Sequence, residues 1–145
     1  MNELASNRKA LHDFEILNRF EAGLELTGHE AKAIRIGKLN LRGAFIDLRG
    51  GEAYLLNAEL PPYQEKNAPQ DYEPKRARRL LLSKSELEEL AQVTETKGLT
   101  IVPLAVYNKG RFLKVDVAVA RGKRQFDKRE SIKKRDTERE LKRTL

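Results

Sequence analysis

Residues 111–120 alternate apolar side chains with polar or small ones, which is the pattern of a β-strand with one buried face. Valines occupy one side of this stretch, and Asp116 lies on the other. Residues 100–106 form a second strand-like stretch, and an Asn-Lys-Gly segment joins the two as a hairpin. After Gly122 the periodicity stops. The chain therefore contains an antiparallel β structure that its last residues do not extend.

Shorter segments before this hairpin have the same pattern. Alternation predicts further strands at residues 14–16, 20–26, 43–48 and 53–56. We expect a hairpin or a bend at residues 17–19 between the first two strands. A glycine pair at 50–51 predicts a tight turn between the last two.

Two helices and one long loop interrupt these strands. Residues 29–36 have apolar residues at helical spacing and are followed by Gly37, which predicts a short helix. Ser83 and Glu86 form a capping box that opens a second helix. We expect its inner face to consist of Leu87, Leu90 and Ala91. Prolines mark residues 61–74 as a surface loop. Several short strands around a few helices favour a closed or nearly closed β-barrel, with a sandwich as the alternative.

The positive charge of the chain is concentrated at its end. The net charge is +7, and residues 121–145 contain 11 Lys and Arg against 5 Asp and Glu. The first 120 residues are close to neutral. The chain therefore divides into a barrel, residues 1–125, and a basic tail, residues 126–145. The tail lacks a continuous apolar face, so we expect it to be disordered alone and to become helical against a polyanion. A solubilising tail is the plainer alternative.

Composition argues against several other classes of protein. The chain has no cysteine, which is consistent with a reducing compartment. No apolar run is long enough to span a membrane, and residues 1–9 lack a signal-peptide core. We therefore expect a cytoplasmic protein without a membrane contact. His12 and His29 lie in separate elements, so we expect no catalytic site, metal or cofactor. An RNA-processing enzyme that uses either histidine is the rival hypothesis.

Basic clusters point instead to nucleic acid. The candidate phosphate-binding residues in the barrel are Arg8, Lys9, Lys32, Arg35, Lys38, Arg78 and Lys123. Phosphate contacts of this kind give affinity without sequence readout. Glu21 is the opposite case, because a carboxylate repels phosphate but accepts hydrogen bonds from base amino groups or ribose 2′-hydroxyls.

An ordered series of motifs resembles the SsrA-binding protein (SmpB) family. The similarity covers roughly residues 7 to 140. Its motifs are NRKA from Asn7, HDFEI from His12, FEAGL from Phe20, LTGHEAK from Leu26, RIGKLNL from Arg35, GEAYL from Gly51, RRLLL from Arg78, KGLTIVPL from Lys97, AVARGK from Ala118 and DKRE from Asp127. Asn108, Glu59, Glu73 and residues 64–71 depart from the family pattern.

The resemblance implies an OB-like antiparallel β-barrel with a few flanking helices. It also implies a non-catalytic, monomeric adaptor that binds the tRNA-like part of transfer-messenger RNA and brings it to stalled ribosomes. Its partners would include the ribosomal decoding centre and messenger channel and, through the RNA, elongation factor Tu and alanyl-tRNA synthetase. The alternative is a generic OB-fold protein that binds single-stranded nucleic acid.

The resemblance also adds residues to the predicted sites. Asn7, Glu21, Asn40 and Leu81 join the basic residues above on the RNA-binding surface, although Leu81 lies in a triple-leucine run typical of a core. The tail would probe the empty messenger channel through Asp127, Lys128, Arg129, Lys133, Lys134 and Arg135.

Overall fold

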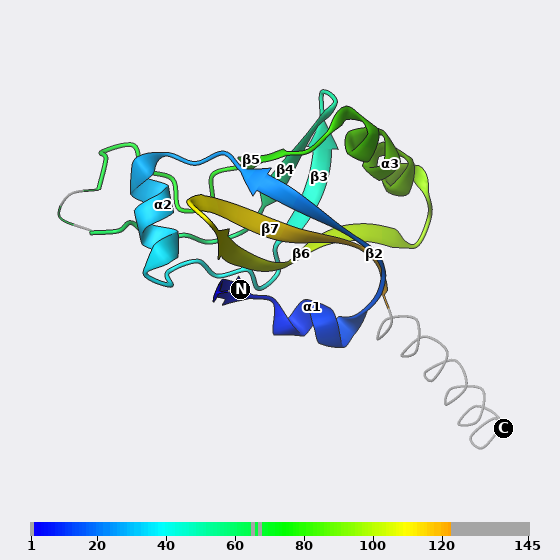
Figure 1. Cartoon of the computed structure of the whole chain (residues 1–145), viewed down its shortest axis with the longest axis horizontal. Coiled ribbons are helices and arrows are strands. Elements are labelled where there is room, and N and C mark those ends of the chain that lie inside the picture. The colour runs from blue at the N-terminus through cyan, green and yellow to red at the C-terminus, as the bar shows by residue number, and fades with distance from the viewer. Residues whose placement is uncertain (1, 65, 67, 123–145) are drawn as a thin grey trace, which may run out of the picture.

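The part of the chain that the structure describes is mainly β, with three short helices (Figure 1). The computed structural model describes residues 2–64, 66 and 68–122. The elements are β1 (Asn2–Ser6), α1 (Arg8–Asp13), β2 (Phe14–Leu24), α2 (Gly28–Arg35), β3 (Phe45–Arg49), β4 (Glu52–Leu56), β5 (Arg78–Leu81), α3 (Lys84–Glu95), β6 (Leu99–Lys109) and β7 (Phe112–Gly122).

The seven strands form one antiparallel sheet in the order β1-β6-β7-β2-β5-β4-β3. The sheet curls so that β3 packs against β6 across the interior. Within the described residues its two edge strands, β1 and β3, are not paired with each other. The predicted mainly β, barrel-like fold with flanking helices is confirmed, as a barrel that is not fully closed by hydrogen bonds.

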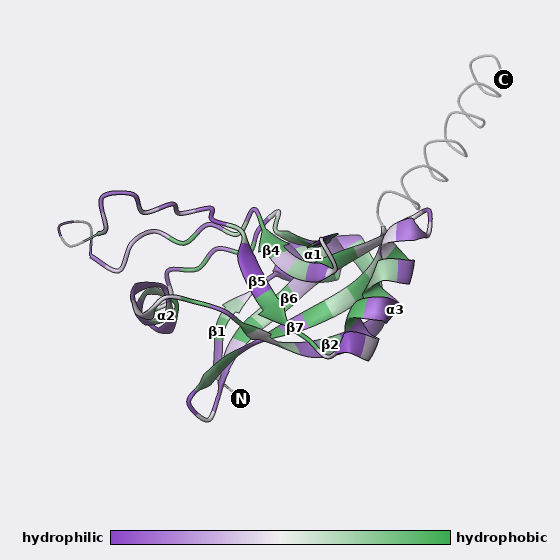
Figure 2. Cartoon of the chain, turned by 90° about the horizontal axis from the view of Figure 1, so that it is seen from above, coloured by the Kyte–Doolittle hydropathy of each residue, from purple (hydrophilic) through white to green (hydrophobic). Residues whose placement is uncertain are grey.

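Alternating strand residues and two helices form the core. Val115 and Val117 of β7 point inward and are 0% exposed, together with Leu80 of β5. Ile34 from α2 and Leu90 from α3 complete the same cluster. The two helices lie at opposite ends of the sheet (Figure 1). Figure 2 shows hydrophobic residues along the inner strands and hydrophilic residues on the outer sides of the helices.

Local sequence signals set where α2 and α3 begin. Ser83 and Glu86 form the predicted capping box at the start of α3. A second capping box, between Thr27 and Glu30, begins α2 and was not predicted. The predicted inner position of Ala91 is wrong, because this residue is exposed while Val93 packs against the core.

The predicted hairpin or bend at residues 17–19 is also wrong. β2 is one continuous strand, and its pairing with β7 shifts between Ile16 and Asn18. A β-bulge places one extra residue in a strand without ending it, so the alternation changes phase as it would at a turn. β1, α1 and β5 were not predicted either. α1 is only six residues long, and β5 begins within a run of basic residues.

The candidate tail lies outside the described residues. The described chain ends at Gly122, which pairs with Phe14 at the start of β2, next to the end of α1. None of the helices in the described part of the chain is long and apolar enough to cross a membrane.

Candidate nucleic-acid interface

One outer face of the barrel gathers side chains from four adjacent strands, and all but one of them are polar. Gly23 of β2 pairs with Leu81 of β5 on one side and with Lys114 of β7 on the other, and Lys114 pairs with Tyr107 of β6. Paired residues project from the same side of a sheet, as does Glu21, two residues along β2. We call this surface the strand face. It consists of Glu21, Leu81, Tyr107, Lys109 and Lys114.

Gly23 explains why Leu81 lies open on this surface. A Cβ atom at residue 23 would lie 3.2 Å from the Cβ of Leu81, which is closer than neighbouring side chains normally approach. The glycine leaves room for the leucine to pack flat over the backbone of β2. Leu81 is 47% exposed, whereas the preceding Leu80 is 0% exposed in the core.

Glu21 is the acidic member of the strand face. Its Oε2 accepts a hydrogen bond from the Tyr107 hydroxyl at 2.5 Å, and its Oε1 accepts one from Lys109 Nζ at 2.9 Å. These two hydrogen bonds, that of Tyr107 first, lower the pKa of Glu21. Burial and the hydrogen bond to Glu21 raise the pKa of Tyr107, so its hydroxyl remains a donor. The carboxylate is therefore held ionised among cations.

The tip of the β6–β7 hairpin extends this basic region toward α2. Arg35 of α2 donates a hydrogen bond from Nη2 to the carbonyl oxygen of Arg111 at 3.0 Å. Phe112, next along the hairpin, is 66% exposed, and Lys114 Nζ lies 5.7 Å from the centre of its ring. Lys32 is exposed on the same helix. The structure thus connects the predicted α2 cations to the strand face through the hairpin.

A second polar surface is an open hollow of about 500 Å³ beside α1. Its lining residues are Ser6, Asn7, Arg8, Lys9, His12, Asp13, Asn40 and Arg42. Four predicted residues from two separate motifs, Asn7, Arg8, Lys9 and Asn40, therefore meet here. Because cations outnumber the single carboxylate of Asp13, the hollow suits an anionic group such as phosphate. It shares no residue with the strand face.

Asn7 has a structural role within this hollow. The residue is 4% exposed, and its side chain caps α1 by accepting a hydrogen bond from Ala10 N. Its Nδ2 donates to the carbonyl oxygen of Pro103, and its backbone N–H donates to that of Leu104. Asn7 thus fixes the start of α1 against β6 and so positions Arg8 and Lys9.

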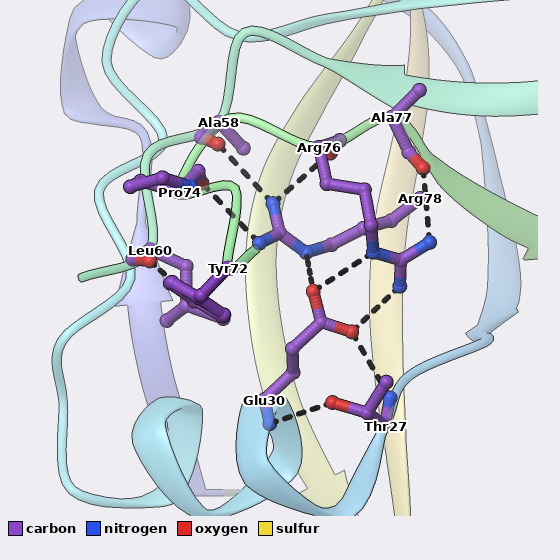
Figure 3. Close-up of polar contacts among 9 residues, drawn as sticks. All are labelled: Thr27, Glu30, Ala58, Leu60, Tyr72, Pro74, Arg76, Ala77 and Arg78. Atoms are coloured by element: carbon purple, nitrogen blue, oxygen red, sulfur yellow. Dashed lines mark hydrogen bonds and ion pairs between the residues drawn. The ribbon is translucent and has the colours of Figure 1, made fainter. Parts of the chain in front are cut away.

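Arg78 does not lie on the surface. Its side chain is 0% exposed, and its Nε donates to Glu30 Oε2 at 2.8 Å (Figure 3). Its other donors reach the carbonyl oxygens of Ala58, Arg76 and Pro74. The expectation of direct phosphate contact by Arg78 does not agree with this placement. In the sequence, Arg78 stands in a run of basic residues and looks like part of a solvated cluster. Its buried position becomes clear only when its partner Glu30, 48 positions away, is known.

The buried carboxylate of Glu30 holds this arrangement together. Its two oxygens accept four hydrogen bonds, two from Arg76, one from Arg78 and one from the backbone N–H of Thr27 (Figure 3). Burial alone would raise the pKa of Glu30, but these donors and charges outweigh burial and lower it to about 2. The cluster ties the start of α2 to the segment that leads into β5.

Other predicted residues have varied positions. Lys38 donates from Nζ to the carbonyl oxygens of Pro62 and Tyr63, so it anchors one end of the long loop. His29 Nε2 accepts a hydrogen bond from Tyr63 N at the same place. Lys123 and the predicted tail residues Asp127, Lys128, Arg129, Lys133, Lys134 and Arg135 lie outside the described residues.

His12 and Asp13 are neighbours on α1, and their side chains contact each other. His12 Nδ1 is 3.1 Å from Asp13 Oδ1, and Lys9 also pairs with this aspartate. Within the described residues, no group of three or more His, Asp or Glu side chains is arranged to hold a metal ion.

Sequence reasoning missed Tyr107, Lys109, Lys114 and Arg42. The strand phase of residues 112–122 places Lys114 on the outer side, so this position was open to prediction. The contact of Tyr107 with Glu21 was not, because it joins residues 86 positions apart.

Comparison with known proteins gives the family. The SmpB protein family model matches residues 4–145. This chain belongs to the SmpB family. It is 48% identical over 144 residues to the SsrA-binding protein of Ligilactobacillus salivarius strain UCC118, covering 99% of this chain and 92% of that protein. It is 46% identical to the SsrA-binding protein of Carboxydothermus hydrogenoformans, covering 98% and 95% of the two chains.

A solved structure gives the same result for the fold. A chain from the work described as "tmRNA-SmpB: a journey to the center of the bacterial ribosome" superposes with a TM-score of 0.69 and 43% sequence identity. The similarity covers 88% of this chain and 92% of that chain. The SmpB fold of the described barrel and the family resemblance of its sequence therefore agree.

Proposed function

We propose that this SmpB-family chain is a tmRNA-binding adaptor of trans-translation, which brings transfer-messenger RNA to stalled ribosomes. The family match across residues 4–145 carries this conclusion. A relative named SsrA-binding protein and a structural neighbour named for tmRNA and the ribosome support both partners. The chain acts by binding and positioning RNA, without catalysis of its own, in the cytoplasm and as a monomer.

The strand face is the surface we assign to the tRNA-like part of the RNA. Lys109 and Lys114 supply charge for phosphates, and Leu81 offers an apolar contact for a base or sugar. Glu21 accepts hydrogen bonds that phosphate cannot give. Lys32 and Arg35 extend the phosphate contacts across α2.

The hollow beside α1 is the surface we assign to ribosomal RNA. The described chain ends at Gly122, which pairs with Phe14 just beyond the end of α1, and the hollow lies beside the same helix. The tail, residues 126–145, would then follow the messenger channel toward the decoding centre. Elongation factor Tu and alanyl-tRNA synthetase would act through the RNA.

A binding comparison tests this function. The tRNA-like domain of tmRNA and an unstructured strand of equal length are titrated with the full chain at matched salt, because phosphate contacts depend strongly on salt. We expect the structured RNA to bind more tightly. Equal binding would favour the generic single-strand binder, which normally stacks bases on several exposed aromatic rings. Among the large hydrophobic residues exposed in the described chain, the only aromatic ones are Phe45 and Phe112.

Deletion of residues 126–145 tests the division of labour. The truncated chain should retain most of its affinity for the tRNA-like domain and lose peptide tagging on stalled ribosomes. A matched loss of RNA affinity and tagging would contradict the separate roles of barrel and tail.

A further inference from the structure

The Tyr107 hydroxyl lies beneath the Glu21 carboxylate and donates a hydrogen bond to it. The positive charge of the strand face does not by itself account for this contact. Tyr107 is only 6% exposed, whereas the Glu21 side chain is 36% exposed. Each carboxylate oxygen accepts one hydrogen bond, Oε2 from Tyr107 and Oε1 from Lys109. A carboxylate oxygen accepts about two hydrogen bonds, so each oxygen of Glu21 keeps one acceptor position that neither Tyr107 nor Lys109 fills.

The groups around Glu21 come from four strands. They are Glu3 of β1, Tyr107 and Lys109 of β6, Lys114 and Asp116 of β7, and Arg19 of β2, which pairs with Asp116. The cations attract the RNA backbone. The ionised carboxylate among them excludes phosphate from its own position, because phosphate offers no donor and carries the same charge.

We propose that Tyr107 is a positioning residue, whose hydroxyl holds the Glu21 carboxylate to accept a hydrogen bond from a donor group of the bound RNA. The donor is an exocyclic amino group of an unpaired base or a ribose 2′-hydroxyl. This inference rests on the proposed function and deepens it, because it names a point of recognition within a surface that otherwise binds phosphate.

Fixing the carboxylate in advance has a physical benefit. A glutamate side chain has three rotatable bonds, and ordering it on binding reduces affinity. The buried Tyr107 and the Lys109 ammonium hold both oxygens before RNA arrives. The free acceptor positions are therefore aimed without a further loss of side-chain freedom.

A double-mutant cycle tests this coupling. E21Q, Y107F and the double variant are titrated with the tRNA-like domain of tmRNA. We expect Y107F to weaken binding about tenfold and E21Q at least as much, the scale of one hydrogen bond to a charged group. The double variant should bind like E21Q alone, because Tyr107 acts only through Glu21. Losses that multiply would overturn the proposal.

Tyr54→Phe is the matched control. Tyr54 is a half-buried tyrosine of β4 whose hydroxyl makes no hydrogen bond within the described part of the chain. Its variant should bind RNA like the wild type. Urea unfolding of all variants identifies any loss of fold, and equal weakening by Y54F and Y107F would count against a specific role for Tyr107.

The pH dependence of binding separates positioning from general structural support. The Tyr107 hydrogen bond stabilises ionised Glu21, so its removal raises the pKa of the carboxyl toward its ordinary value. As pH falls, Y107F should therefore lose RNA affinity at a higher pH than the wild type. E21Q should not show the loss of RNA affinity that comes from protonation of Glu21, because it has no carboxyl at this position. Identical acid profiles of wild type and Y107F would contradict the proposal.

RNA analogues distinguish the two donor sources. One series of tRNA-like domains lacks single exocyclic amino groups, with inosine for guanosine as an example, and a second lacks single 2′-hydroxyls. One substitution should weaken binding to the wild type and leave binding to E21Q unchanged. The series in which it occurs identifies the base or the ribose. If no position in either series depends on Glu21, the inference fails.

Failure of the inference differs from failure of the proposed function. If the wild type does not prefer the tRNA-like domain to an unstructured strand, the function itself is wrong. If the wild type has this preference, and E21Q and Y107F bind the tRNA-like domain as tightly as the wild type does, only the proposed role of Tyr107 and Glu21 is wrong.

Discussion

Glu30 and Glu21 are both glutamates held by hydrogen-bond donors, and donor groups lower the pKa of each. The side chain of Glu30 is 2% exposed and that of Glu21 is 36% exposed. Glu30 accepts four hydrogen bonds from its own chain and has no acceptor position left for a ligand. Glu21 accepts two. The number of free acceptor positions, more than charge or pKa, separates the structural carboxylate of Glu30 from that of Glu21, which we propose binds RNA.

The largest expected difference between the two sites is in stability. Glu30→Gln leaves the buried Arg78 guanidinium without its charged partner, and breaking a buried pair in this way costs about 3–5 kcal/mol of unfolding free energy. Glu21→Gln should lower the free energy of unfolding far less than Glu30→Gln, because the site is open to water. Urea unfolding of both variants measures this. Equal losses would remove the distinction between the two carboxylates.

Adjacent leucines of β5 make the same comparison with apolar side chains. Leu80 is 0% exposed and Leu81 is 47% exposed. Leu80→Ala should lower the free energy of unfolding by about 2–5 kcal/mol, as core truncations do. Leu81→Ala should change stability little and weaken binding of the tRNA-like domain instead. The prediction fails if Leu81→Ala destabilises the barrel and leaves RNA affinity unchanged.

Acid unfolding should depend on Glu30. Its pKa is about 2 in the folded protein against an ordinary value of 4.5. A carboxyl with a lowered folded pKa gives stability that is present above the unfolded pKa and is lost as pH falls through the folded one. The wild type should therefore lose stability between about pH 4.5 and 2 through this group. Denaturant midpoints across this range should fall less steeply in E30Q, and parallel curves would contradict the assignment.

The smallest expected effect concerns salt. Lys114→Gln should reduce the slope of log affinity against log salt by about one, because one phosphate contact is lost. Glu21→Gln should weaken binding without reducing this slope, since its partner is a hydrogen-bond donor and not a phosphate. Lys97→Gln, beyond the end of α3, is the control and should match the wild type. A reduced slope in E21Q would show that Glu21 does not act as a local acceptor.

The family-derived site residues illustrate the limit of sequence reasoning. Glu21 and Leu81 were predicted separately, and the register of β2 and β5 brings them onto one face. Arg8 and Lys9 join Asn40 in the hollow only because α1 packs beside the loop before β3. Charge identified the residue types that attract RNA. It did not separate the buried Arg78 from the exposed Lys109.

Local sequence determined the elements whose signals lie within a few residues. The capping box of Ser83 begins α3, the glycine pair at 50–51 turns β3 into β4, and alternating valines make β7. Tertiary structure alone decided the roles of the two carboxylates. Glu30 meets Arg78 and Glu21 meets Tyr107 across 48 and 86 positions of chain. Burial and hydrogen-bond saturation are properties of the packed barrel, and no local pattern contains the partner that creates them.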